Sequence, residues 1–149
     1  MSELWARTPE VGTTYTACLV ESLSRRHIAE YAGASGDFNR VHTDESFAVH
    51  AAGRPSVIAH GMLTMGLTAT FLTQLVGHGS LVSFGGRFRA PVLPGQRLTS
   101  TVTVQELHVL PAGDNVRLHV VTRADETTVA FEGQALARSG RSAGTAQHG

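Results

Sequence analysis

The chain has 149 residues, of which 42% are hydrophobic and 16% are charged. This length predicts a single domain with its own core, and the composition excludes wholesale disorder. Twelve basic residues balance twelve acidic ones, which argues against a nucleic-acid-binding protein because such proteins carry a basic excess. Cys18 is the only cysteine and cannot form an intramolecular disulfide. Together with the lack of a signal-peptide pattern in residues 1–7, it predicts a cytoplasmic location.

Three segments open the chain. Residues 1–13 show little periodicity and are expected to form a loose lead-in. Residues 14–20 are rich in β-branched side chains and predict a strand that carries Cys18 into the core. A helix is expected over residues 25–34 with Ser24 as its N-cap, because apolar side chains recur there at helical spacing. Thr43 is then expected to cap a short helical turn.

A long stretch without charge follows. Residues 55–86 contain no Asp, Glu, Lys or Arg. Within this stretch, residues 60–76 predict a helix that is apolar on every side, so we expect protein to surround it. A membrane span is the weaker interpretation, because several threonines dilute the apolar residues and glycines interrupt the stretch at residues 77–79.

The second half of the chain alternates between apolar and polar residues, as strands do. Strands are expected over residues 81–89, 98–109, 116–122 and 129–137. The sequence Leu-Pro-Gly-Gln at residues 93–96 predicts a type II turn. The long second strand is expected to change register where Val102 and Val104 give way to Leu107 and Val109.

Together these patterns predict an α+β fold. Four consecutive antiparallel strands, read as a meander, must cover their apolar face, and the uncharged helix is the element that can fill it. The expected domain is therefore one antiparallel sheet wrapped around a central apolar helix, with a disordered tail over residues 139–149. Such a sheet has open edges, so we expect a dimer.

A polar cluster lies on the loop after the first predicted helix. Asp37, Asn39 and His42 fall within six residues, and in a loop their side chains can converge on one point. A carboxylate beside an imidazole can accept and return protons near neutral pH, while the Asn39 amide orients them. Turn formation is the commoner use of Asp and Asn in loops. A metal site of Asp37, His42 and His60 lacks the usual helical spacing of histidine ligands.

The start of the uncharged helix offers a second functional feature. Unpaired N–H groups at a helix N-terminus carry a partial positive charge and can stabilise an oxyanion. Gly61 leaves these groups open, with His60 before it and Met62 after it. Gly61 could equally serve to relieve packing, and His60 could serve as a hydrogen-bonding residue at the helix start.

These motifs resemble those of a known family. The sequence YAGASGDFNRVH at residues 31–42 resembles the signature of MaoC-like (R)-specific enoyl-thioester hydratases and 3-hydroxyacyl-thioester dehydratases. IAHGM at residues 58–62 is similar to the start of that family's central helix. FRAPVLPG at residues 88–95 is similar to its strand followed by a Pro-Gly turn. The likeness covers residues 10–138 and is closest to dehydratase subunits of actinobacterial type II fatty acid synthesis.

The resemblance implies a fold, a site and a reaction. It implies a hot-dog domain over residues 14–138, catalytic Asp37 and His42 with Asn39 assisting, and a thioester carbonyl that meets the helix end near Gly61. It implies reversible syn addition of water to an enoyl thioester of coenzyme A or acyl carrier protein, with no cofactor and no metal. The partner would be a second hot-dog subunit, identical or homologous.

One residue departs from the pattern. Arg40 stands where many members have proline, which would leave the loop freer and add a charge beside the site. The uncharged stretch can line an acyl tunnel, with Met62, Met65 and Phe71 as candidates, although core packing is the commoner role of such residues.

Two alternative functions remain on the same scaffold. The first is a hot-dog acyl-thioester hydrolase, although such enzymes usually carry a carboxylate on the central helix and residues 61–76 have none. The second is a non-catalytic acyl-binding subunit of a heterodimeric dehydratase, which the complete set of Asp37, Asn39 and His42 argues against. The chain length of the acyl group, the carrier, the direction of reaction and the pathway stay open.

Overall fold

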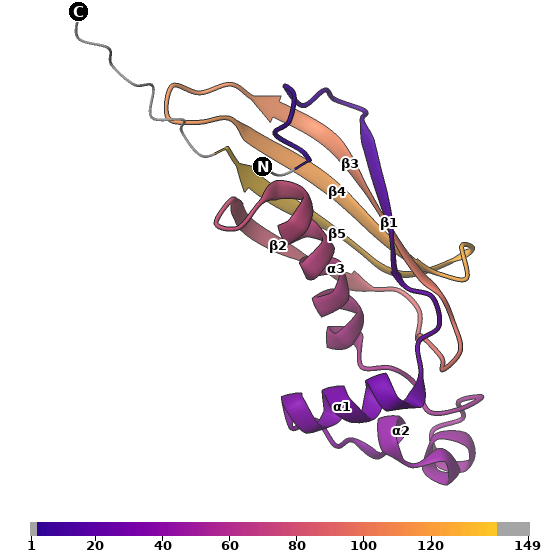
Figure 1. Ribbon diagram of the computed structural model, residues 1–149. Helices are drawn as coiled ribbons and strands as arrows, with labels where there is room; N and C mark the ends of the chain where they lie inside the picture. The colour runs from indigo at the N-terminus through magenta and orange to yellow at the C-terminus, as the bar shows by residue number, and fades with distance from the viewer. Residues whose placement is uncertain (1–2, 140–149) are drawn as a thin grey trace, which may run out of the picture.

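The computed structural model describes residues 3–139, and in this range one antiparallel sheet curves around one side of a helix (Figure 1). The elements are β1 (Thr14–Val20), α1 (Arg25–Ser35), α2 (Arg40–Thr43), η1 (Phe47–Ala51), α3 (Gly61–Val76), β2 (Leu81–Phe88), β3 (Leu98–His108), β4 (Asn115–Ala124) and β5 (Thr128–Arg138). The short elements α1, α2 and η1 gather at the N-terminal end of α3 (Figure 1). The predicted α+β class is confirmed. Of the tail predicted over residues 139–149, only Ser139 lies within the described range.

The strand order corrects the predicted four-strand meander. The order is β1-β3-β4-β5-β2, so only β3, β4 and β5 follow one another as neighbours. β2 pairs with β5 at one edge, and β1 pairs with β3 at the other. Because β2 and β3 are not neighbours in the sheet, residues 89–97 form a crossover rather than a hairpin. Val92 within this crossover is buried in the core at 3% exposure.

Turn and register predictions hold inside this different order. Gly95 has a φ of +92° and the Gln96 N–H donates to the carbonyl of Leu93 at 3.3 Å, as the predicted turn requires. The β3–β4 register shifts between Val104 and Glu106, inside the interval where the sequence predicted a change.

Cys18 does not enter the core. It lies on the exposed face of β1, between neighbours that are partly buried on the other face. Side chains in a strand alternate between faces. The pattern therefore placed Cys18 and the partly buried Tyr15 and Ala17 on opposite faces, but composition alone did not say which face was inside.

One face of α3 packs against the sheet and another is open to solvent. The buried residues are Thr64, Thr68, Leu72, Leu75 and Val76. The exposed residues recur every fourth position and are Met62, Gly66, Thr70 and Gln74. The expectation that protein surrounds this helix on all sides is therefore wrong within this chain. We call these four exposed residues the open stripe of α3.

Thr68, a buried threonine of α3, belongs to a chain of hydrogen-bonded hydroxyl groups. The Thr68 hydroxyl donates to the Thr64 carbonyl at 2.8 Å and lies 2.8 Å from the Thr122 hydroxyl. Thr122 in turn donates to Ser100 at 3.1 Å. Because the hydroxyl groups of Thr68, Thr122 and Ser100 all have partners, the helix can contact the sheet through these polar side chains without a large desolvation cost.

The lead-in is docked rather than loose. Leu4 is buried at 1% exposure, and its N–H donates to the carbonyl of Leu75 at 3.0 Å. The indole of Trp5 donates to the carbonyl of Val76 at 2.8 Å. Residues 4 and 5 thus satisfy carbonyl groups that the end of α3 leaves unpaired.

The limits of the domain stay a prediction. No helix within residues 3–139 has the length and apolarity that crossing a bilayer needs.

A close approach of β2 and β5 generates the first prediction. A Cβ atom on Gly133 would overlap the carbonyl oxygen of Gly85 and lie 3.0 Å from the Cα of Gly86. We expect Gly133→Ala to lower the free energy of unfolding in urea by about 1–3 kcal/mol, as overpacking does. The control is Gly33→Ala in α1, where nothing lies within 4 Å of the new Cβ, and it should raise stability by up to about 1 kcal/mol. Equal stability of the two variants would contradict the close approach.

Candidate active site

The end of α1 fixes the position of Asp37. The helix ends at Gly36, whose φ of +74° is left-handed, and its N–H donates to the carbonyl of Ala32 at 2.9 Å. The Ser35 hydroxyl donates to the Tyr31 carbonyl at 2.7 Å and accepts from the Asp37 N–H at 3.2 Å. The chain therefore leaves the helix in one direction, toward the start of α3.

Asn39 orients the Asp37 carboxylate through its backbone. The Asn39 N–H donates to Oδ1 of Asp37 at 3.2 Å, which leaves Oδ2 for other contacts. The side chain of Asn39 caps α2, because its Oδ1 accepts from the N–H of Val41 at 3.1 Å. Asn39 thus sets the geometry of the loop, and a direct contact with substrate stays a prediction.

The charge that Arg40 adds beside the site is paired, whereas its effect on the freedom of the loop stays a prediction. Its guanidinium donates to Oδ2 of Asp44 at 2.8 and 3.2 Å and lies 4.6 Å from the centre of the Phe47 ring. The N–H of Phe47 and the Arg40 guanidinium lower the pKa of Asp44. The turn that was assigned to a Thr43 cap is therefore capped by Asp44, whose Oδ1 accepts from the Phe47 N–H at 3.0 Å.

His42 faces Asp37 with an unprotonated nitrogen when it is neutral. Its Nδ1 lies 2.8 Å from the Ile58 carbonyl oxygen, and a carbonyl only accepts, so Nδ1 carries the hydrogen. Nε2 then holds a lone pair and lies 3.9 Å from Oδ2 of Asp37. The His42 side chain is 11% exposed and that of Asp37 is 54% exposed. The loop thus brings the two together, with a gap longer than a hydrogen bond.

His60 ties the same loop to the helix start. Its Nε2 donates to the backbone carbonyl of Asp37 at 2.9 Å, and the residue is 2% exposed. Its ring stacks on His42 with centroids 3.8 Å apart and contacts Tyr31 at 4.9 Å. Its Nδ1 is buried without a partner among residues 3–139. Of the two roles that the sequence left open for His60, these contacts favour hydrogen bonding at the helix start.

Glu45 holds the segment before α3 in place. Its Oε2 accepts from Arg25 at 2.9 Å and from the Val57 N–H at 3.0 Å. The hydrogen bond from Arg25, and next that from Val57, lowers the pKa of Glu45. A lowered folded-state pKa contributes stability above the unfolded pKa, and this contribution is lost as pH falls through the folded pKa. The support of this segment therefore weakens in acid.

The start of α3 leaves two backbone donors open. No hydrogen bond joins the N–H of Gly61 or of Met62 to another group in residues 3–139, and no side chain caps the helix. A Cβ atom on Gly61 would lie 3.1 Å from the Phe88 ring. Gly61 therefore leaves room for the Phe88 ring and, at the same time, exposes donors that could bind an oxyanion.

Two pockets meet at His42, Gly61 and Phe88. The first has a volume of about 280 Å³ and also contains Asp37, with Tyr31, Ser35, His60 and Met62. The second has a volume of about 400 Å³ and contains Arg54, with Thr64 and Arg89. Of the three residues considered for an acyl tunnel, Met62 lines the first pocket at 53% exposure, whereas Phe71 packs against the core.

The residues considered as a metal site also converge. Potential ligand atoms of Asp37, His42 and His60 all lie within 4.8 Å of one another. Sequence spacing was a poor guide here, because the loop folds back onto the helix start. The same three groups can serve proton transfer, and the absence of a metal stays a prediction.

Comparison with known proteins assigns the family. Residues 7–130 match the sequence pattern of a family described as "MaoC like domain". The chain belongs to the MaoC-like family. It is 37% identical over 105 residues to the (R)-specific enoyl-CoA hydratase of Aeromonas caviae, covering 68% of this chain and 75% of that protein.

Other relatives of this MaoC-like chain carry similar names. Identity is 38% over 94 residues with the (R)-specific enoyl-CoA hydratase of Rhodospirillum rubrum, covering 62% of this chain and 65% of that protein. It is 32% over 97 residues with 3-hydroxyacyl-thioester dehydratase Y of Mycobacterium tuberculosis, covering 63% of this chain and 33% of that protein. The match thus spans less than two thirds of the length of both proteins. These names support the prediction of a hydro-lyase.

Solved structures agree on the fold. The (R)-hydratase from A. caviae involved in PHA biosynthesis has a TM-score of 0.76 at 28% identity, covering 89% of this chain and 98% of that one. A chain of the ChsH1-ChsH2 complex from M. tuberculosis has a TM-score of 0.72 at 21% identity, covering 87% of this chain and 97% of that one. The hot-dog fold expected from the resemblance is confirmed.

The two histidine hydrogen bonds yield a spectroscopic prediction. In ¹⁵N spectra at a pH where both rings are neutral, His42 should be protonated at Nδ1 and His60 at Nε2, because each of these nitrogens faces a carbonyl oxygen. The variants His42→Ala and His60→Ala assign the two sets of signals among the eight histidines. A neutral His42 protonated at Nε2 would contradict this arrangement.

Proposed function

We propose that this chain catalyses reversible syn addition of water to a trans-2-enoyl thioester, or the reverse dehydration of an (R)-3-hydroxyacyl thioester. The observation that carries the proposal is the 3.9 Å gap between Nε2 of His42 and Oδ2 of Asp37. The gap is too long for a direct hydrogen bond, but one oxygen atom fits about 2.8 Å from each group. This oxygen is the water that adds, or the C3 hydroxyl that leaves.

Protons balance within this pair. In dehydration, Nε2 of neutral His42 takes the C2 proton, and the electron pair of the C–H bond moves toward the thioester oxygen. The electron pair then returns to form the C2=C3 double bond as the C3–O bond breaks, and the proton on His42 passes to the departing hydroxyl, which leaves as water while Asp37 holds it by a hydrogen bond. Hydration runs the same steps in reverse. Both bonds change on the face of the substrate that His42 contacts, which accounts for a syn course.

The start of α3 supplies the electrostatic part of the proposal. Removal of the C2 proton places negative charge on the thioester oxygen. Gly61 and Met62, whose N–H groups are free, line the same pocket as His42. Their N–H groups are held in place by the helix before the charge develops. Such preorganised donors stabilise a transition state more than solvent does. Residues 55–86 bring no charge that would compete with them.

The hydrolase alternative lacks support in this geometry. A thioesterase needs a group that directs water at the carbonyl carbon, and α3 carries no carboxylate. Among residues 3–139, Asp37 is the only carboxylate that lines either of the two pockets, and its Oδ2 lies 3.9 Å from Nε2 of His42. The alternative of a non-catalytic acyl-binding subunit also lacks support, because the side chains of Asp37 and His42 lie close together.

A second hot-dog subunit, identical or homologous, is the partner that we propose. β2 is an edge strand, and Val82 on it is 51% exposed. The open stripe of α3 starts at Met62 in the candidate site, so a second subunit would cover it. The ChsH1-ChsH2 structure shows that this fold occurs in a complex of two named subunits. The cytoplasmic location stays a prediction that rests on the single cysteine.

Activity tests the site directly. The purified protein should hydrate a trans-2-enoyl-CoA. Asp37→Asn and His42→Ala should each lower kcat by about 10²–10⁴-fold, because His42 transfers the proton and Asp37 holds the oxygen that is added or lost. Asp114→Asn and His108→Ala make the same chemical changes at the other end of the sheet and should keep near wild-type rates. Circular dichroism checks that all four variants fold. Full activity in either site variant would remove that residue from the mechanism, and release of free thiol from acyl-CoA would favour the hydrolase.

The oligomeric state tests the partner. Light scattering of the wild type should give a dimer or larger, because the sheet edge and the open stripe need a cover. Val82→Lys should shift the distribution toward monomer, since it places a charge on the β2 edge. Val109→Lys is the control, because Val109 is 73% exposed just beyond the end of β3. An active monomeric wild type would contradict the role of a second subunit.

A further inference from the structure

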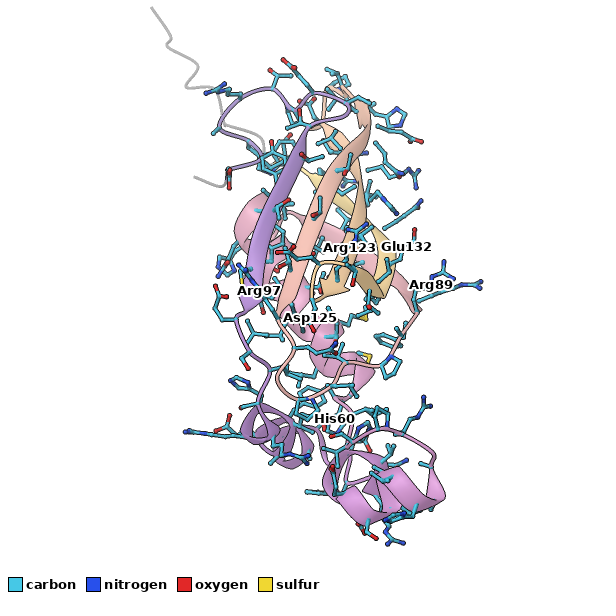
Figure 2. All side chains as sticks on the ribbon, turned by 90° about the vertical axis from the view of Figure 1, so that its right-hand side faces the viewer. His60, Arg89, Arg97, Arg123, Asp125 and Glu132 are labelled. Carbon is cyan, nitrogen blue, oxygen red and sulfur yellow. The ribbon has the colours of Figure 1, made fainter. Side chains whose placement is uncertain are left out.

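Arg54 is a cation in the second pocket that no carboxylate neutralises. Its backbone is anchored, because its N–H donates to the Ala48 carbonyl at 2.8 Å. Within residues 3–139 its guanidinium enters no ion pair, whereas Arg89 in the same pocket is bound to Glu132 at 2.9 Å. Figure 2 shows Arg89 and Glu132 together at the edge of the sheet. Arg54 is thus the charge in this pocket that remains available to a ligand.

The two pockets carry charges of opposite sign. The pocket on one side of His42 contains the Asp37 carboxylate, and the pocket on the other side contains Arg54 and Arg89. No charged residue of the segment 55–86 modifies this contrast. An anionic part of a ligand is therefore repelled from the first pocket and attracted into the second.

A thioester that reacts at His42 can send one arm into each pocket, because His42, Gly61 and Phe88 line both. The first pocket shares Tyr31 with an apolar pocket of about 370 Å³ beneath α1. That apolar pocket is lined by Leu19, Val20, Leu23, Leu63 and Leu67, among others. An acyl chain gains free energy by entering such a surface. The arm on the sulfur side of the thioester is polar and ends in phosphate. Since the acyl chain takes the first pocket, this arm enters the second.

We propose that Arg54 binds a phosphate of the carrier arm, with Arg89 as a second cation held in place by Glu132. The inference rests on the proposed function, because that function supplies the thioester. A guanidinium forms strong, bidentate hydrogen bonds with phosphate. Coenzyme A and acyl carrier protein both present phosphate at the end of a pantetheine arm, so this chemistry is common to both carriers.

The test compares carriers that share the pantetheine arm; the pantetheine and 4′-phosphopantetheine thioesters differ in the phosphate alone. One trans-2-enoyl group is offered as its CoA, 4′-phosphopantetheine, pantetheine and acyl-carrier-protein thioesters, to wild type, Arg54→Gln and Arg26→Gln. Arg26 is the control, because it is an exposed arginine paired with Glu30 on α1. Arg54→Gln should lower kcat/KM about tenfold, mainly through KM, for substrates with phosphate. The pantetheine thioester should be unaffected, and Arg26→Gln should match wild type throughout.

The pattern of loss identifies the phosphate. A loss shared by the CoA, phosphopantetheine and carrier-protein thioesters places Arg54 on the 4′-phosphate, whereas a loss with CoA alone places it on the nucleotide phosphates. Either result supports the proposal. An equal loss with pantetheine, or no loss with any carrier, overturns it.

A binding measurement separates this inference from the proposed function. Calorimetry with free coenzyme A needs no turnover, and Arg54→Gln should raise the Kd about tenfold. Added salt should weaken binding to wild type more than binding to the variant, because screening acts on the removed charge. Weaker binding of CoA by the variant, without hydratase activity in the wild type, would keep the inference and reject the function. If wild type and Arg54→Gln hydrate the enoyl thioester equally fast with every carrier, the proposed function is kept and the inference about Arg54 is rejected.

Discussion

Two hydrogen bonds from histidine rings to backbone carbonyls hold the candidate site together. His42, on the loop, donates to Ile58 on the approach to α3, and His60, at the start of α3, donates back to Asp37 on the loop. A backbone bond of 3.2 Å from Ile58 N–H to the Val41 carbonyl lies between them. The same contacts that bring the loop to the helix also decide which nitrogen of each ring carries hydrogen. Position and protonation are therefore set together, and a change in one ring alters both.

The uncharged stretch gives this arrangement its electrostatic effect. Residues 55–86 contain no Asp, Glu, Lys or Arg, so the carboxylate and the guanidinium groups that line the two pockets at the start of α3 all come from other segments, in Asp37, Arg54 and Arg89. The helix rests on the sheet through Thr68 and Thr122, which are paired with each other and add no net charge. A carboxylate on α3 would oppose an oxyanion at Gly61, so the composition of the helix suits enolate chemistry better than carboxylate-assisted hydrolysis.

Local patterns in the sequence predicted local structure well and spatial order less well. The bounds of β1, the Ser24 cap, the turn at residues 93–96 and the register shift in β3 follow from residue types at fixed spacing. The position of β2 beside β5 does not, because it depends on a crossover over residues 89–97 whose Val92 is buried in the core. Alternation likewise grouped the residues of β1 correctly by face, yet it did not reveal that the face with Cys18 is outside. The docking of Leu4 and Trp5 depends on carbonyls at the end of α3, far along the chain.

The part of the candidate site that depends on residues close together in the sequence could be predicted. A loop that holds Asp37 and His42 within six residues, and a glycine at a helix start, are visible in the sequence. The contact of His60 with the Asp37 carbonyl is not, because it arises only when loop and helix pack. The open stripe of α3 was missed for a related reason, since hydropathy does not report which side of a helix the sheet leaves bare. That stripe begins at Met62, next to Gly61 and in the pocket of Asp37. A subunit that covered the stripe would therefore also narrow that pocket, so the proposed subunit contact and the proposed acid–base pair share one surface.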